Sequence, residues 1–438
     1  MRPRSTSLED LHARTLQFID TSTTSSRSRR FRPSYPRQAW RQYARRMPAL
    51  DARSELNEFG ASVRERLRPF FMEEVNPGAD ERDGKDLRIP SALMQRAAEL
   101  GLFGQSLPKE LGGQALDLMH WARTLEQVGY LSDDTSFSTL LSLRVAIAHA
   151  IWSTGRADLI ERYARPMARG ELRGALAYSD SADAFSFRSI ARKEGSGYIL
   201  NGEKFLVTGG SDADVFMTYL KEESGDLIVV LIERTDGGVT TEPVPVTGLR
   251  SMGLSNFKFK DTVVSAERVM VAHDGLSHAQ RFLNSRRALL VCGPLGGMEA
   301  IIELCITSLE GVVRYRMPVL EMPNVQATLG QMFVHLETSR AILYRALEHV
   351  AHSKDYNSLF DPLVSAAKYY VAERSVNVCH AAFRLLGGKG YTRAFKVERF
   401  LRDAYGLMAG GGAQDILEIQ LGEYAVSKVH TSNFRGKK

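Results

Sequence analysis

The hydrophobic pattern changes twice along this chain, and the changes limit the folds that it can adopt. From residue 51 to 150 apolar side chains recur at three- and four-residue steps, as from Leu56 to Leu67, which indicates amphipathic helices. From about 172 to 270 short β-rich runs alternate with turn residues. The helical period then returns from 274 to 432. We therefore predict an α+β chain in which a helical domain, a β domain of barrel or sandwich type and a helical bundle follow one another.

These changes of pattern also predict the domain boundaries. We expect a helical domain over residues 51–171, a β domain over residues 172–273 and the helical bundle over residues 274–432. A basic extension, residues 1–50, precedes them, and a short basic tail, residues 433–438, follows. The bundle should contain long helices around residues 324–352, 361–386 and 412–428.

The positive charge of the chain is concentrated in the extension. Residues 1–50 hold eleven Arg and three acidic residues, a balance of 11 − 3 = +8. The rest holds 57 − 11 = 46 basic and 51 − 3 = 48 acidic residues, a balance of −2, which argues against a nucleic-acid partner for the body. Such an extension is typical of a disordered arm, and its Arg- and Ser-rich composition also fits an organelle-targeting peptide. The expected location is therefore the cytoplasm, or an organelle matrix if the extension is a targeting peptide.

Within the β segment, glycine-rich punctuation separates the predicted strands. Asn201-Gly202 predicts a hairpin turn between two of them. The β-rich runs are Ile190–Ala191, Tyr198–Leu200, Phe205–Thr208, Val215–Leu220, Leu227–Glu233 and Phe257–Phe259.

The cysteines and the apolar runs restrict the class of protein further. Cys292, Cys305 and Cys379 are far apart and have no metal-type spacing, so we expect buried free thiols and no metal site. No run of 18 or more apolar residues is present, so we expect no membrane span.

Three motifs, in order, resemble those of the acyl-CoA dehydrogenase family across residues 55–432. They are Leu200-Asn-Gly-Glu-Lys204 with Thr208, the strand from Gly253 to Asp261 with Val264, and Leu386-Gly-Gly-Lys-Gly-Tyr391 followed by Glu398-Arg-Phe-Leu-Arg-Asp403. The resemblance implies the family's fold, with a C-terminal four-helix bundle, and FAD as the cofactor. It also implies a homodimer or homotetramer, an acyl-CoA or acyl-carrier-protein substrate, and an electron acceptor or a flavin reductase as a further partner.

By the same resemblance, one group of residues lies near the flavin ring. Thr208 stands where the family has a threonine, and a hydroxyl there suits the flavin N5 and O4 edge. Leu206 replaces the tryptophan that covers the flavin. Ser179 or Ser181 would supply a second hydroxyl, unless these serines only cap a turn.

A second group would meet the cofactor's pyrophosphate across a dimer. The family's arginine motif has become Val312-Val-Arg-Tyr-Arg-Met-Pro318, so Arg314 or Arg316 would take its part. Arg384 replaces the family's glutamine. Gly387 and Gly388 would let the backbone approach the cofactor, although a helix C-cap is the alternative interpretation.

The family's catalytic glutamate is missing from both of its known positions. Gly411 occupies one of them and Arg286 occupies the other. Removal of an α-proton from a thioester needs a base close to that carbon, and Asp415 is the weak candidate for a displaced one. Arg287 matches the arginine that meets the CoA phosphate, and Gly411 would border the substrate.

Three functions remain open on this evidence. The first is a flavin oxidoreductase that acts on the CH–CH bond of an acyl thioester with an atypical or missing general base. The second is a flavin-dependent monooxygenase of the same fold, which needs no α-proton base. The third is a non-catalytic relative that acts in binding or assembly, because fold alone does not fix function.

Overall fold

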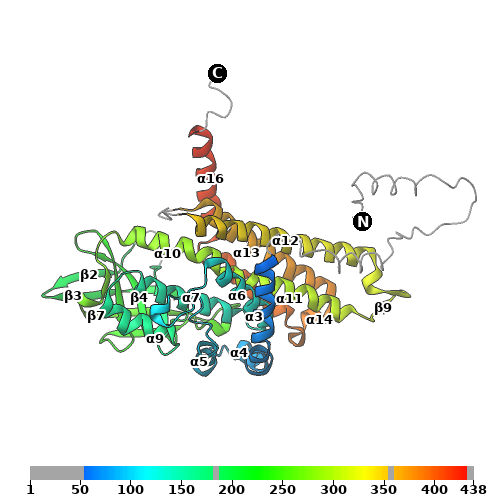
Figure 1. The fold of residues 1–438 in the computed structure, drawn as a ribbon, viewed down its shortest axis with the longest axis horizontal. Coiled ribbons are helices and arrows are strands. Elements are labelled where there is room, and N and C mark those ends of the chain that lie inside the picture. Colours follow the sequence, from blue (N-terminus) through cyan, green and yellow to red (C-terminus); the bar gives the residue numbers. More distant parts are fainter. Residues whose placement is uncertain (1–53, 181–186, 354–359, 432–438) are drawn as a thin grey trace, which may run out of the picture. The chain divides into compact units, whose positions relative to one another are not determined.

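The computed structural model describes residues 54–180, 187–353 and 360–431. The predicted extension, residues 1–50, and the basic tail, residues 433–438, lie outside the described residues. Within the described part, helices come first, a mixed β-sheet follows, and helices return (Figure 1). The predicted succession of helices, β-structure and helical bundle is therefore confirmed.

The first helices pack an apolar stripe of each helix into a common core. In α3, Val63 and Leu67 are buried one turn apart, as the four-residue spacing predicts. Side-chain oxygens of Asp117 and Asp134 accept hydrogen bonds from the first turns of α6 and α7 and fix where these helices begin. The helices are α3 Ser54–Pro69, α4 Ala79–Gly84, α5 Ser91–Glu99, α6 Leu118–Leu131, α7 Thr135–Trp152, α8 Ala157–Leu159 and α9 Arg165–Ala168.

The middle segment forms an eight-stranded sheet in the order β6-β7-β3-β2-β4-β5-β8, with β1 paired to β4. β4 pairs in parallel with β1 and β2, and the other pairs are antiparallel. The sheet has its own apolar cluster, in which Phe216 and Phe257 stack with ring centroids 3.9 Å apart. The strands are β1 Gly174–Ala177, β2 Ile190–Glu194, β3 Gly197–Val207, β4 Val215–Glu222, β5 Leu227–Glu233, β6 Val239–Pro243, β7 Ser255–Ser265 and β8 Val269–Val271.

The hairpin predicted at Asn201-Gly202 is wrong, because β3 continues through both residues. The pairing of β3 with β7 shifts register between Leu200 and Gly202, which makes this point a bulge. Asn201 uses its side chain at the bulge: its Nδ2 donates to Asp261 Oδ1 at 3.1 Å, and its Oδ1 accepts from Asp261 N at 2.9 Å. The turn between β2 and β3 comes earlier, between Glu194 and Gly197.

The last part of the chain is helical apart from one short hairpin. α10, α11, α12 and α13 run beside one another, and α14 and β9 lie at the end of the bundle far from the sheet (Figure 1). The elements are α10 Gly275–Leu290, α11 Cys292–Leu309, β9 Val313–Arg314, β10 Met317–Pro318, α12 Pro323–His352, α13 Pro362–Leu386, α14 Gly388–Tyr391, α15 Val397–Ala409 and α16 Gln414–Thr431.

Close contact between α6 and α11 ties the two helical parts together. A side chain on Gly129 would meet the Gly293 carbonyl oxygen at 1.9 Å, and one on Gly296 would meet the Glu126 oxygen at 1.8 Å. Only glycine therefore permits this approach of the two backbones. By length and composition alone, Gly275–Leu309 could cross a membrane, but 67% of its apolar window is buried within the protein, as in a core helix.

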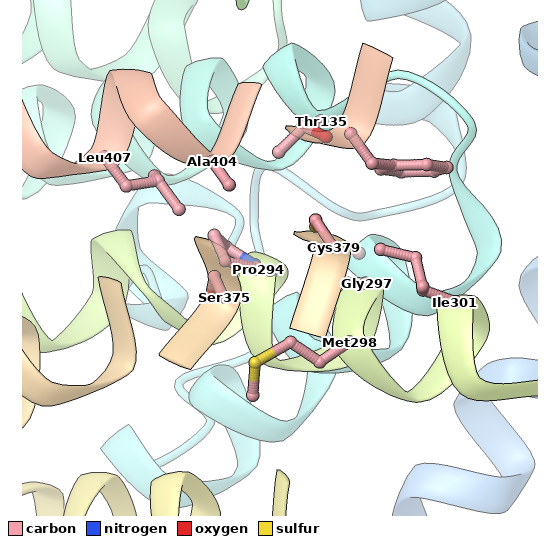
Figure 2. Close-up of a pocket in the computed structure, with 12 residues that line it drawn as sticks. Thr135, Pro294, Gly297, Met298, Ile301, Ser375, Cys379, Ala404 and Leu407 are labelled. Carbon is pink, nitrogen blue, oxygen red and sulfur yellow. The ribbon is translucent and has the colours of Figure 1, made fainter. Parts of the chain in front are cut away.

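A small cavity lies where α11, α13 and α15 meet (Figure 2). Its volume is about 20 Å³, and Pro294, Met298, Ser375, Cys379 and Leu407 are among the residues that line it. A space of this size holds about one water molecule. It therefore cannot be the binding pocket for an acyl group. The three cysteines are buried and unpaired, as predicted.

Candidate functional site

Side chains from two helices, α10 and α13, hold the loop that joins α15 to α16. Arg287 on α10 donates from Nε to the Gly411 carbonyl oxygen at 2.9 Å. Lys368 on α13 donates from Nζ to the Gly412 carbonyl oxygen at 2.6 Å and to Gln414 Oε1 at 2.9 Å. The loop is thus fixed by two cations that bind its backbone and the first residue of α16.

The shape of this loop depends on glycine at position 411. Gly411 has φ +71°, a left-handed conformation that L-residues with a side chain rarely adopt. A Cβ atom there would lie 2.8 Å from Leu290 Cδ2. The backbone conformation and the packing of Leu290 therefore both oppose a side chain, and hence a carboxylate, at this position.

Lys368 is the unusual titratable group of the loop. Its side chain is 0% exposed, and its two hydrogen-bond acceptors are neutral oxygens. Burial, reinforced by the positive charge of Arg287, lowers the pKa of Lys368 to about 7. The amine therefore changes its charge near neutral pH.

Arg286 lies next to this loop on α10. It precedes Leu290 by four residues, so the two side chains follow one another on the same helix face, and Leu290 borders Gly411. The two positions at which the family has its glutamate are thus connected through Leu290. Burial lowers the pKa of Arg286 to about 10, and its buried Nη1 has no hydrogen-bond partner among the described residues.

The carboxylates considered in place of the missing base lie elsewhere or are already engaged. Asp415 is exposed in the first turn of α16, whereas its neighbour Gln414 is the residue that contacts Lys368. Glu398, a second carboxylate close to Gly411 in the sequence, forms an ion pair with Arg402 at 2.7 Å. Asp415 remains a candidate without support from its position.

The residues expected near the flavin ring lie where β3 ends, at a rim of the sheet that we call the Thr208 edge. Thr208 follows β3 and is half-buried, and its hydroxyl forms no hydrogen bond within the part of the chain that the structure describes. Leu206 is 59% exposed with φ +53°. The Ser179 carbonyl oxygen accepts from Phe205 N at 2.9 Å, which places Ser179 beside this strand. Ser181 lies outside the described residues.

This sheet edge approaches the helix that carries Arg286 and Arg287. Burial raises the pKa of Tyr178, the residue before Ser179, and the nearby charge of Arg287 partly opposes that rise. Beneath the edge, Lys204 donates to the Tyr178 carbonyl oxygen at 3.2 Å and forms a buried ion pair with Asp180. The loop around Gly411 and the edge around Thr208 therefore border the same region, between the sheet and the bundle.

The residues expected at the cofactor's phosphates lie far from that region. Arg314 and Arg316 flank Tyr315 at the exposed tip of the β9–β10 hairpin, where Tyr315 is 96% exposed. The hairpin follows the 35-residue helical run Gly275–Leu309, which begins beside the sheet and is roughly 50 Å long.

Arg384, Gly387 and Gly388 are also exposed, at the end of α13. They lie roughly 25 Å along that helix from Lys368. One copy of the chain therefore does not bring the two groups of predicted cofactor residues together.

Comparison with known proteins agrees with the layout of the chain. Three family descriptions match in order: "Acyl-CoA dehydrogenase, N-terminal domain" at residues 58–171, the middle domain at 178–262 and the C-terminal domain at 273–425. These matches cover well over half of the chain. The chain belongs to the acyl-CoA dehydrogenase family, as its motifs predicted.

Individual relatives are distant but match over nearly their whole length. The chain is 25% identical to a 3-(aryl)acrylate reductase of Clostridium sporogenes over 82% of this chain and 96% of the relative. It is 26% identical to the mitochondrial isovaleryl-CoA dehydrogenase of Pongo abelii over 86% of this chain and 90% of that relative. The solved structure of the prolyl acyl carrier protein oxidase AnaB superposes with a TM-score of 0.79 at 23% identity, over 85% of this chain and 99% of that one.

Sequence reasoning missed Lys368, Leu290 and Gln414. A signal for Lys368 was present, because it lies between Val364 and Val371 on the apolar face of a predicted helix, where a lysine is out of place. Leu290 and Gln414 carried no such signal. Their role follows from the contact of α10 and α16 with the loop, and only the structure gives that contact.

Proposed function

We propose that this protein is an FAD-dependent oxidoreductase that acts on the CH–CH bond of an acyl thioester. One observation carries the proposal: the Thr208 edge of the sheet and the Gly411 loop border a common region in a chain of the acyl-CoA dehydrogenase family. The first supplies an uncommitted hydroxyl and an exposed apolar residue, and the second supplies buried cations.

The residues on the sheet edge fit the ring of a flavin. A flavin needs hydrogen-bond donors at its polar edge and apolar contact on its faces, and Thr208 and Leu206 offer these. When bound, FAD supplies the hydride chemistry. The chain's own residues orient it and exclude water. The phosphate end requires Arg314, Arg316 or Arg384, which lie too far away in the same copy. We therefore propose a homodimer or a larger homo-oligomer in which a second copy supplies them.

The proton-transfer step must differ from that of an enzyme with a glutamate in this site. Neither Gly411 nor Arg286 can accept a proton from a substrate carbon at neutral pH. Three cations border the site, Arg286, Arg287 and Lys368, and they favour a substrate on which negative charge develops. This arrangement supports reduction of an unsaturated thioester as readily as oxidation of a saturated one.

A second candidate function is favoured by the same cations. A flavin-dependent monooxygenase needs no carboxylate base, and Arg286 in place of that base suits stabilisation of an oxyanion. The two candidates differ in whether molecular oxygen is incorporated into the product. The substrate, whether carried on CoA or on a carrier protein, and the electron acceptor or flavin reductase belong to the same proposal. Three unpaired cysteines favour a reducing compartment, which is the cytoplasm, or an organelle matrix if the basic extension is a targeting peptide.

The test begins with the visible spectrum of the purified protein and the identity of the released flavin. We expect bound FAD, reoxidation of the reduced enzyme by an α,β-unsaturated acyl thioester without oxygen, and loss of FAD binding in Thr208→Val. Oxygen uptake with labelled oxygen in the product would select the monooxygenase. No saturable FAD binding below about 1 mM, a free energy of only about −4 kcal/mol, would overturn both candidates and leave a non-catalytic relative.

A further inference from the structure

Arg286 is a partly buried cation with no ion pair among the residues that the structure describes. Its Nη1 atom is buried and has no hydrogen-bond partner among the described residues. The shift in its pKa comes from burial, with no contribution from a neighbouring carboxylate. An isolated charge in such a place is costly unless something pairs with it.

Five other arginines of the described residues are more deeply buried than Arg286. Four of them form an ion pair with an aspartate in the same chain: Arg82 with Asp134, Arg144 with Asp212, Arg268 with Asp236 and Arg399 with Asp80. No such carboxylate pairs with Arg286 among the described residues. We therefore look for its partner in the ligand of the site.

The location of Arg286 limits what that partner can be. The side chain lies one helical turn from Leu290, beside the Gly411 loop and therefore in the region assigned to the reacting carbons. A neutral thioester carbonyl would not balance a full positive charge. A carboxylate matches a guanidinium in charge and in its two parallel hydrogen bonds.

We infer that Arg286 binds a carboxylate carried by the acyl group of the substrate, so that the thioester is that of a dicarboxylic acid. This inference rests on the proposed function and names its substrate class. Lys368 already donates to Gly412 and Gln414, and Arg287 already donates to Gly411 and Asn284. Within the described part of the chain, Arg286 forms no such hydrogen bond.

The test measures binding to the FAD-loaded enzyme from the change in flavin absorbance, with turnover prevented by omitting the electron acceptor. The probes are three pairs of thioesters with equal carbon numbers: succinyl- and butanoyl-CoA, glutaryl- and pentanoyl-CoA, and adipoyl- and hexanoyl-CoA. In at least one pair we expect the dicarboxylic member to bind about tenfold more tightly or better, which corresponds to 1.4 kcal/mol.

The variants assign that preference to Arg286. Arg286→Gln should remove the preference, so that the two members of each pair bind with similar affinity. Arg345→Gln, which removes an exposed arginine on α12, should keep the preference. Arg286→Lys keeps the charge but loses the two-pronged geometry and should show an intermediate preference, and it serves as the second variant if the glutamine form does not fold. Without ligand, Arg286→Gln should melt no lower than the parent protein, because the arginine has no partner to lose.

Two results would overturn the inference: no preference in any pair, or a preference that survives in Arg286→Gln. In either case a protein that still binds FAD and monocarboxylic thioesters keeps the proposed function. A protein that binds neither FAD nor any thioester loses the proposed function together with the inference.

Discussion

The Nε atom of Arg287 donates to the carbonyl oxygen of Gly411 across 2.9 Å, between residues 124 positions apart in the sequence. Arg287 is 7% exposed, and its Nη1 donates to Asn284 Oδ1 within the same helix. Sequence comparison alone assigned this arginine to the phosphate of CoA. In the structure its guanidinium positions the loop that replaces the catalytic glutamate, so any role at the phosphate remains a prediction.

Arg287→Ala should therefore destabilise the fold as well as weaken thioester binding. The loop carbonyl would lose a charge-assisted hydrogen bond in a buried place, and we expect a loss of about 1.5–3 kcal/mol in the free energy of unfolding. Urea unfolding measures this loss, and Arg345→Ala on the exposed face of α12 is the matched control. An unchanged unfolding midpoint would show that the bond to Gly411 contributes nothing to stability.

Gly411→Glu should not restore a catalytic base by itself. The left-handed backbone and the 2.8 Å approach to Leu290 Cδ2 oppose a side chain, and the conformational part alone costs about 1–2 kcal/mol. In a Leu290→Ala background the space is present, and we expect flavin reduction by a saturated acyl-CoA to rise. Gly411→Gln in the same background is the control, because a glutamine side chain has the size of glutamate but cannot act as a base. Equal rates for the two double variants would contradict the prediction.

Lys368 makes stability depend on pH above neutrality. Its pKa is lowered to about 7 from an ordinary value of 10.5, so the unfolded chain binds a proton between these values that the folded chain releases. Stability should therefore rise between pH 7 and about 10, by up to about 1.4 kcal/mol per pH unit. Lys368→Met removes this contribution. Unfolding of both proteins is measured at pH 7.0 and 9.5. The free energy of unfolding should change less between these values in the variant than in the parent protein, and an equal change in both would refute the assignment.

Asp403 should make stability fall as the pH rises, and it should do so at lower pH than Lys368 acts. Burial raises its pKa to about 7 from 3.8, while a hydrogen bond from Leu249 N at 2.6 Å partly opposes the rise. The folded protein thus keeps a proton on Asp403 that the unfolded chain loses above about pH 4. The contribution of Asp403 to stability is therefore complete below pH 3.8 and is lost as the pH rises to about 7. Asp403→Asn keeps the acceptor for Leu249.

The difference in the free energy of unfolding between the asparagine variant and the parent protein should move in favour of the variant by a few kcal/mol as the pH rises from 5 to 7.5. Thermal unfolding at these two values checks the difference. A constant offset between the two proteins would mean that Asp403 is ionised in the folded state.

The succession of elements could be read from the sequence because periodicity reports local burial. Val63 and Leu67 are buried where the helical spacing placed them, and the predicted helices around 324–352 and 361–386 correspond to α12 and α13. Asn201-Gly202 failed because a local turn preference competes with pairing across the sheet. The contacts of Asn201 with Asp261, sixty residues away, favour a bulge.

The candidate site was predictable only as a set of positions. The motifs located Thr208, Gly411 and Arg286, but they could not show that Leu290 fills the space beside Gly411 or that Arg286 forms no ion pair with any residue that the structure describes. Both facts depend on which helices meet at the loop. Contacts between α10, α13 and α16 are tertiary, and residues at their crossing points carry ordinary local signals.

The distance between the sheet edge and the β9–β10 hairpin has a consequence for mixtures of defective proteins. If two copies complete each other's cofactor sites, Thr208→Val damages one end of a site and the paired changes Arg314→Gln and Arg316→Gln damage the other. Each variant alone then has no intact site. A heterodimer of the two has one site with both defects and one site with none. Coexpressing two inactive proteins would therefore recover part of the activity, which is intragenic complementation within a single assembly.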